Sequence, residues 1–177
     1  MESMRKYLNT VNATDDETCR LLTDALSQIL PEVLIEGGAD EPFYKAAKNN
    51  DKAKIIYRSN YPRSLLHELS HYCLAGNRRR NIDDFGYWYS PCGRSFEEQQ
   101  RFELVEARPQ GLEKVMCELV GLKFSPSLDD FSGMPNSQMF LKKLEESYQE
   151  MTSNPPSTAS KVLEGLKLFK QTAWTKN

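Results

Sequence analysis

Runs of apolar residues at helical spacing, each ended by proline or glycine, constrain the fold of this chain most. The clearest run extends from Pro62 to Ala75, where leucine and cysteine side chains recur three or four positions apart. This spacing lines one face of an α-helix, and proline suits the first turn because its missing N–H would have no helical partner there. We therefore expect a helix over residues 62–75, ended by a left-handed cap at Gly76-Asn77.

The same pattern predicts helices elsewhere in the chain. Two of them open with the form of a capping box, at Thr14-Asp15-Asp16-Glu17 and at Ser95-Phe96-Glu97-Glu98. Pro109 lacks a helical donor and clashes with the preceding turn, so we expect it to kink or break the second of these helices. The expected helical stretches run from Thr14 to Pro31, from Ser95 to about Ala107, on to Leu119, from Gln138 to Met151, and through Val162–Phe169.

Short β-prone segments alternate with these helices. Residues 32–36 and 53–57 are rich in β-branched and aromatic side chains, Gly37-Gly38 is expected to end the first, and Asp84–Tyr89 is a third candidate strand. Residues 45–53 and 123–136 are expected to be loops. The pattern predicts an α+β fold, a single domain over residues 1–177 in which several helices pack on a small mixed sheet.

Composition excludes several classes of protein. The chain has 177 residues, a net charge of −2 and no apolar run long enough to cross a bilayer. The near-neutral charge argues against a dedicated nucleic-acid binder, which usually carries a basic face. The N-terminus lacks the apolar stretch of a secretory signal, and the four cysteines form no CxxC pair. We therefore expect a cytoplasmic protein with reduced thiols.

The only two histidines of the chain lie four apart, in His67-Glu68-Leu69-Ser70-His71. Residues four apart on a helix lie on the same face, so both imidazoles can bind one metal ion. Glu68 points about 100° around the helix axis, where its carboxylate can reach a water molecule at the metal. The alternative is a helix with two surface histidines and a solvated glutamate.

A catalytic metal site usually has three protein ligands and an open position. No histidine is left, so we expect a carboxylate as the third ligand. Glu103 and Glu106 both lie among apolar residues of the predicted helix after Ser95. We favour Glu106, just before Pro109, with Glu103 as the fallback and an exposed helix glutamate as the alternative reading.

Two histidines and one carboxylate do not identify the metal. With zinc they form a hydrolase site, a peptidase or ribonuclease in which Glu68 acts as general base. With Fe(II) they form the facial triad of non-haem oxygenases. The long zinc-protease motif needs glycine and histidine where this chain has Leu74 and Asn77, so that form is excluded.

Several segments together resemble the bacterial elongation factor P hydroxylase family, over roughly residues 35–125. The segments that carry the resemblance are Asp40–Tyr44, His67–Gly76, Arg79-Arg80, Asp84–Pro91 and Phe102–Gln110. The resemblance implies O₂-dependent hydroxylation of the modified lysine of elongation factor P, after attachment of a β-lysyl group. It also implies a metal site with ligands His67, His71 and Glu106, in an α+β fold reminiscent of a bacterial metal-dependent ribonuclease.

Hydroxylation of an unactivated C–H bond needs a redox metal, so we expect Fe(II) with O₂ as co-substrate and an unidentified reductant. Glu68 is then a proton relay or a group that orients the ligands. The substrate side chain is long and cationic, which makes Asp84, Tyr87, Trp88 and Tyr89 candidates for binding it. An aromatic strand packed on the core is the alternative for these residues. A binding module with a vestigial site is a further alternative for the whole chain.

Overall fold

The computed structural model describes residues 14–86, 95–127 and 137–174. They form six helices and a three-stranded mixed sheet, which confirms the α+β prediction. The elements are α2 (Asp15–Ile29), β1 (Val33–Ala39), β2 (Phe43–Lys45), β3 (Ala53–Arg58), α3 (Pro62–Leu74), α4 (Asn77–Arg80), α5 (Phe96–Val120), α6 (Ser137–Ser153) and α7 (Ser157–Trp174). No helix in this described part is long and apolar enough to cross a membrane.

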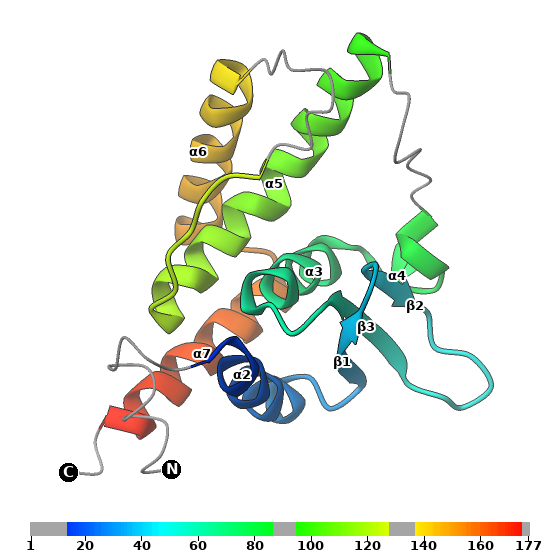
Figure 1. Ribbon diagram of the computed structural model, residues 1–177, viewed down its shortest axis with the longest axis vertical. Coiled ribbons are helices and arrows are strands. Elements are labelled where there is room, and N and C mark those ends of the chain that lie inside the picture. The colour runs from blue at the N-terminus through cyan, green and yellow to red at the C-terminus, as the bar shows by residue number, and fades with distance from the viewer. Residues whose placement is uncertain (1–13, 87–94, 128–136, 175–177) are drawn as a thin grey trace.

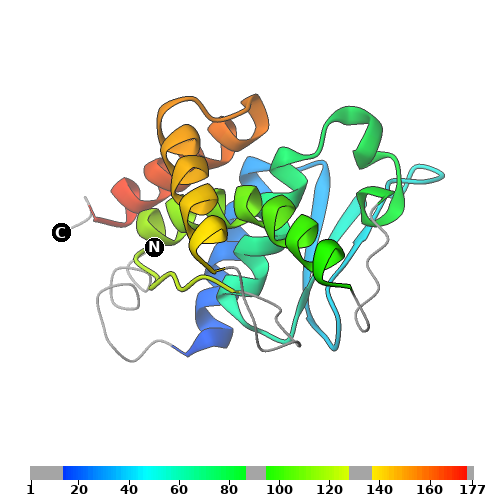
Figure 2. The same ribbon diagram turned by 90° about the horizontal axis from the view of Figure 1, so that it is seen from above.

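Helix α3 lies at the centre of the fold. It packs on β3 and also on α5, so it is placed between the sheet and the long helix (Figure 1). Leu65, Leu66 and Leu69 are fully buried, which fixes the helix in the core. Helices α5 and α6 run side by side, and the view from above shows α6 covering α5 (Figure 2). Helix α7 packs against both α2 and α5.

The sheet has the strand order β1-β3-β2, with β1 parallel and β2 antiparallel to β3. Strand β3 alternates buried and partly exposed residues, so Ala53, Ile55 and Tyr57 face the core. Strand β1 continues through the glycines that were expected to end it, with an irregular register between Glu36 and Ala39. A Cβ at Gly37 would clash with the Tyr57 ring, so a larger residue here would have to displace that side chain.

The prediction of a left-handed cap after α3 is wrong. Ala75 ends the helix in extended conformation, and Gly76, with φ −72°, begins α4. The physical reason is Arg80, whose guanidinium lies 4.4 Å from the centre of the Tyr72 ring and donates to the carbonyls of Tyr72 and Cys73. These bonds satisfy carbonyls at the end of α3 that a glycine cap would otherwise have to pair.

Sequence analysis expected Pro109 to kink or break the helix. Helix α5 continues through Pro109 as a single helix, so a break does not occur there. The Ser95 capping box is confirmed, since Ser95 Oγ accepts from the Glu98 N–H and the Glu98 carboxylate accepts from the Ser95 N–H. Packing against α3, α6 and α7 outweighs the local cost of the proline. At Gly111 the helix approaches α6 so closely that a Cβ would lie 2.7 Å from Ser147 Cβ and 2.8 Å from the Tyr148 backbone nitrogen.

The segment predicted as an aromatic strand begins with a 3₁₀ turn instead, over Asp83–Gly86. Asp84 and Phe85 have φ values of 49° and 56°, which a strand cannot contain. Asp84 Oδ1 accepts from the Tyr44 N–H at 2.8 Å, and the Phe85 ring stacks on Tyr44 at 4.0 Å. The turn thus supports strand β2, which the sequence did not predict.

Candidate metal centre

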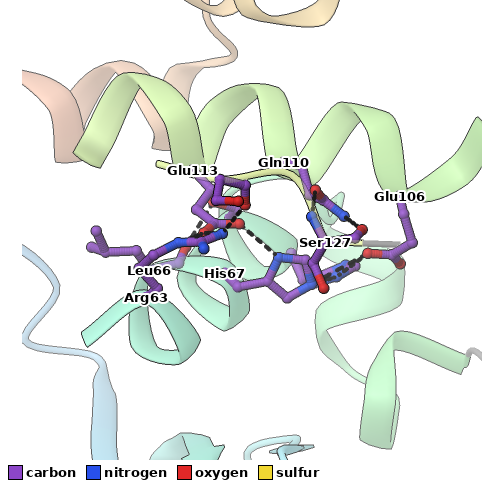
Figure 3. A network of polar contacts seen from close by, with 10 residues as sticks. Arg63, Leu66, His67, Glu106, Gln110, Glu113 and Ser127 are labelled. Carbon is purple, nitrogen blue, oxygen red and sulfur yellow. Dashed lines mark hydrogen bonds and ion pairs between the residues drawn. The ribbon is translucent and has the colours of Figure 1, made fainter. Parts of the chain in front are cut away.

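Two helices bring three metal-ligating side chains together. His67 and His71 project from one face of α3, and Glu106 comes from α5. His67 Nε2 lies 3.1 Å from His71 Nε2 and 3.2 Å from Glu106 Oε2, and His71 Nε2 lies 3.5 Å from the same oxygen. The close-up of the site shows the Glu106 carboxylate turned toward the imidazole of His67 (Figure 3).

The triangle of donor atoms has the size that a bound metal requires. A zinc or iron ion about 2.0–2.2 Å from each of three neighbouring ligands separates those ligands by roughly 3–3.5 Å. The donor set, two imidazoles and one carboxylate, suits zinc or Fe(II) and leaves further coordination positions open. The residues present therefore fit a catalytic divalent metal.

Charge inside the site is balanced even in the metal-free protein. Burial opposes ionisation of Glu106, but the neighbouring imidazoles of His71 and His67 outweigh it and lower the pKa of this carboxyl. Burial also opposes protonation of His67, but the carboxylates of Glu106 and Glu113 raise its pKa well above the usual 6.5. These opposite shifts favour a protonated His67 next to an ionised Glu106 when no metal is bound.

The other side of the His67 ring is held by a glutamate that sequence analysis missed. Glu113 Oε2 lies 3.1 Å from His67 Nδ1, and Glu113 Oε1 accepts from Arg63 Nε at 2.9 Å and Nη2 at 2.7 Å. Spacing places each of these residues on the helix face of a candidate ligand, but it does not show that they meet. Arg63 lies four positions before His67, and Glu113 lies seven positions after Glu106.

The segment after α5 is fastened beside the site by the same two helices. Arg63 Nη2 donates to the Ser125 carbonyl at 2.6 Å. Gln110, one turn after Glu106, accepts from the Ser127 N–H and donates to the Ser127 carbonyl. Figure 3 shows Gln110 and Ser127 meeting next to the imidazole of His67.

A cavity of about 310 Å³ opens next to the donor atoms. His67, Glu106 and Glu113 line it, and Glu68 forms part of the same wall. Burial raises the pKa of the Glu68 carboxyl above its usual 4.5, although the nearby imidazoles of His71 and His67 oppose this shift. Glu68 is not one of the three clustered donors. A partly buried carboxyl at this place can exchange protons with a group bound in the cavity.

The remaining sequence candidates lie as follows. Glu103 is buried like Glu106 but does not join the donor group found among the described residues. Asp84 binds the Tyr44 backbone and does not line the cavity, so its role in substrate binding stays a prediction. Tyr87, Trp88 and Tyr89 lie outside the described residues.

Comparison with known proteins gives two findings. A family model described as elongation factor P hydroxylase matches residues 22–177. A protein of Haemophilus influenzae named elongation factor P lysine hydroxylase is 40% identical over 111 residues. The match covers 62% of this chain and 62% of that protein, so the chain spans less than two thirds of the relative's length.

Proposed function

The chain belongs to the elongation factor P hydroxylase family, and on this premise we propose that it hydroxylates a modified lysine of elongation factor P. The observation that carries the proposal is the group of His67, His71 and Glu106, whose three donor atoms converge. His67 and Glu106 of this group also line a cavity. We propose these residues as the ligands of the metal. The resemblance found in the sequence agrees with the family match, and its finer points, Fe(II), O₂ and a β-lysyl modification, belong to the proposal.

Bound Fe(II) would supply the redox chemistry for hydroxylating an unactivated C–H bond, with O₂ as co-substrate and a reductant as the source of electrons. The chain's own residues then have separate tasks. His67, His71 and Glu106 would hold the ion, and two of them, His67 and Glu106, also line the cavity. Glu68, in the cavity wall, accepts or donates protons during the reaction, as its raised pKa supports.

The substrate would reach the site through the cavity. A modified lysine is a long, flexible side chain, and a cavity of about 310 Å³ can admit such a chain while its parent protein stays outside. Elongation factor P acts in translation, so we also propose that the chain works in the cytoplasm.

The test is a mass measurement on elongation factor P that carries β-lysyl-lysine. The chain loaded with Fe(II), given reductant and O₂, should add the mass of one oxygen atom to the modified lysine, and ¹⁸O₂ should supply that atom. Glu106→Ala should lose both metal and turnover, because two imidazoles alone bind a divalent metal weakly. Glu97→Ala, a change at an exposed glutamate in the first turn of the same helix, is the matched control and should retain both.

Two outcomes would overturn the proposal. Stoichiometric iron and unchanged hydroxylation in the Glu106→Ala variant would place the third ligand elsewhere. Turnover of substrate without O₂ or with zinc alone would indicate a hydrolase in which Glu68 is the general base.

A further inference from the structure

A buried carboxylate stands behind the ring of His67, on the side away from the other donors. His67 Nε2 faces Glu106 and His71, whereas Nδ1 faces Glu113 at 3.1 Å. Only 1% of the surface of Glu113 is exposed, so this carboxylate is shielded from bulk water and needs charged or polar partners within the protein. Figure 3 shows Glu113 and Glu106 at opposite ends of the imidazole, one on each side of the ring.

We infer that Glu113 is a positioning residue for the metal, and that Arg63 holds it in place. An imidazole that binds a metal through Nε2 keeps its proton on Nδ1 and donates it to a neighbouring group. A carboxylate in that place fixes both the tautomer and the direction of the ring. This inference rests on the proposed metal centre, but not on which reaction the metal performs.

The division of the two Glu113 oxygens supports this role. Both hydrogen bonds from Arg63 end on Oε1, at 2.9 Å and 2.7 Å, and Oε2 is left for His67. Arg63 thereby compensates the charge of a buried carboxylate without occupying the oxygen that the imidazole needs. A carboxylate with a purely structural role would have no reason to keep one oxygen for a metal-ligating ring.

Helical geometry places the interacting residues on facing sides of α3 and α5. Arg63 and His67 lie one turn apart on α3, and Glu106 and Glu113 lie two turns apart on α5. The two helices therefore contact each other through two sets of polar side chains. Glu106 meets the histidines at the candidate metal site, and Glu113 meets Arg63 and His67 behind it. Arg63 also donates to the Ser125 carbonyl, so the Arg63–Glu113 pair is connected to the segment that follows α5.

The test uses zinc, which binds without redox chemistry, and measures its affinity by competition with a chromophoric chelator. Glu113→Gln keeps the shape of the side chain but removes its charge, and we expect zinc to bind 10- to 100-fold more weakly. Glu97→Gln, the same change at an exposed position of α5, should leave the affinity unchanged. Unfolding of the metal-free variants, followed by circular dichroism, separates loss of fold from loss of metal.

A second readout looks at the ring itself. The chain has two histidines, so ¹⁵N-histidine labelling gives only four ring-nitrogen signals. In the zinc-loaded protein we expect a protected Nδ1–H proton on His67 that exchanges faster or moves upfield in Glu113→Gln, while the signals of His71 stay in place. A change in packing alone would not act on one ring selectively.

The zinc affinity and the Nδ1–H signal of Glu113→Gln can either support or overturn the role of Glu113. Unchanged zinc affinity and an unchanged Nδ1–H signal in a folded Glu113→Gln variant would reduce the Arg63–Glu113 pair to a structural ion pair and overturn the inference. If the single variant does not fold because Arg63 is left unpaired, Arg63→Met/Glu113→Gln removes both charges and takes its place, with the same expected loss. A protein that binds zinc as expected but does not hydroxylate would count against the proposed function and leave the role of Glu113 standing.

Discussion

Replacing Gly111 by alanine should separate helices α5 and α6 and disturb the metal centre. The added Cβ would lie 2.7 Å from Ser147 Cβ, 2.8 Å from the Tyr148 backbone nitrogen and 2.9 Å from the Ser147 carbonyl carbon. Two of these three atoms belong to the backbone of a helix, so no side-chain rotation can relieve the clash. The helix α6 has to move.

Two opposing effects set the size of the change. Overpacking costs about 1–3 kcal/mol, toward the upper end when backbone must shift. Alanine is the better helix former by about 1 kcal/mol, which offsets part of that cost. We expect a net destabilisation of about 1–2 kcal/mol, which corresponds to a fall in Tm of about 2–8 °C for a chain of this size.

Calorimetric unfolding of the metal-free protein tests this value, and zinc affinity tests its consequence for the site. Gly111 lies between Glu106 and Glu113 on α5, so displacement of the helix should weaken zinc binding as well. Gly76→Ala is the matched control, because its φ is −72° and no atom lies within 4 Å of the added Cβ. A Tm for Gly111→Ala equal to or above that of the parent would show that helix propensity wins, and would refute the close packing of α5 on α6.

The buried thiols and the protonation of His67 allow two further tests. Burial raises the pKa of Cys73 and Cys117 to about 12. Alkylation at about pH 8 should therefore spare both thiols in the native protein and modify both in denaturant, as measured by mass spectrometry. Rapid labelling of the native protein would contradict the burial of these thiols. The raised pKa of His67 means that its protonation stabilises the metal-free fold fully below about pH 6.5, and that this contribution is lost as pH rises through the raised value. Zinc binding to His67 should displace this proton, so the affinity for zinc should rise with pH. Titration calorimetry in buffers of different ionisation enthalpy should detect the released proton. Zinc binding without proton release would contradict the pairing of His67 with Glu106 and Glu113.

Local pattern led to the three proposed ligands but not to the residues that contact them from behind. The spacing of His67 and His71 fixes a shared helix face wherever that helix lies, and Glu106 is a carboxylate among apolar neighbours. The pairing of Glu113 with His67 depends instead on how α5 docks on α3, which no short-range pattern contains. A wider search for carboxylates on the face of Glu106 would have included Glu113.

Tertiary contacts also explain the errors in the secondary structure. Pro109 has an unfavourable local effect that three packed helices override. Gly76 has the residue type of a left-handed cap, but Arg80 had already satisfied the carbonyls that such a cap serves. Strand β2 has only three residues. The N–H of Tyr44 in the strand and the N–H of Ala46 just after it donate to the side chains of Asp84 and Asp83, some 40 residues away. The organisation as one domain over all 177 residues stays a prediction.

The proposed ligands come from two helices, so metal binding and the docking of these helices depend on each other. A chain that has not yet docked α5 on α3 offers an ion two imidazoles and no carboxylate, so tight capture waits until folding is complete. An ion held by all three proposed ligands would tie the two helices together and add its binding free energy to the stability of the native state. The metal-free chain would then be easier to unfold than the metal-loaded one.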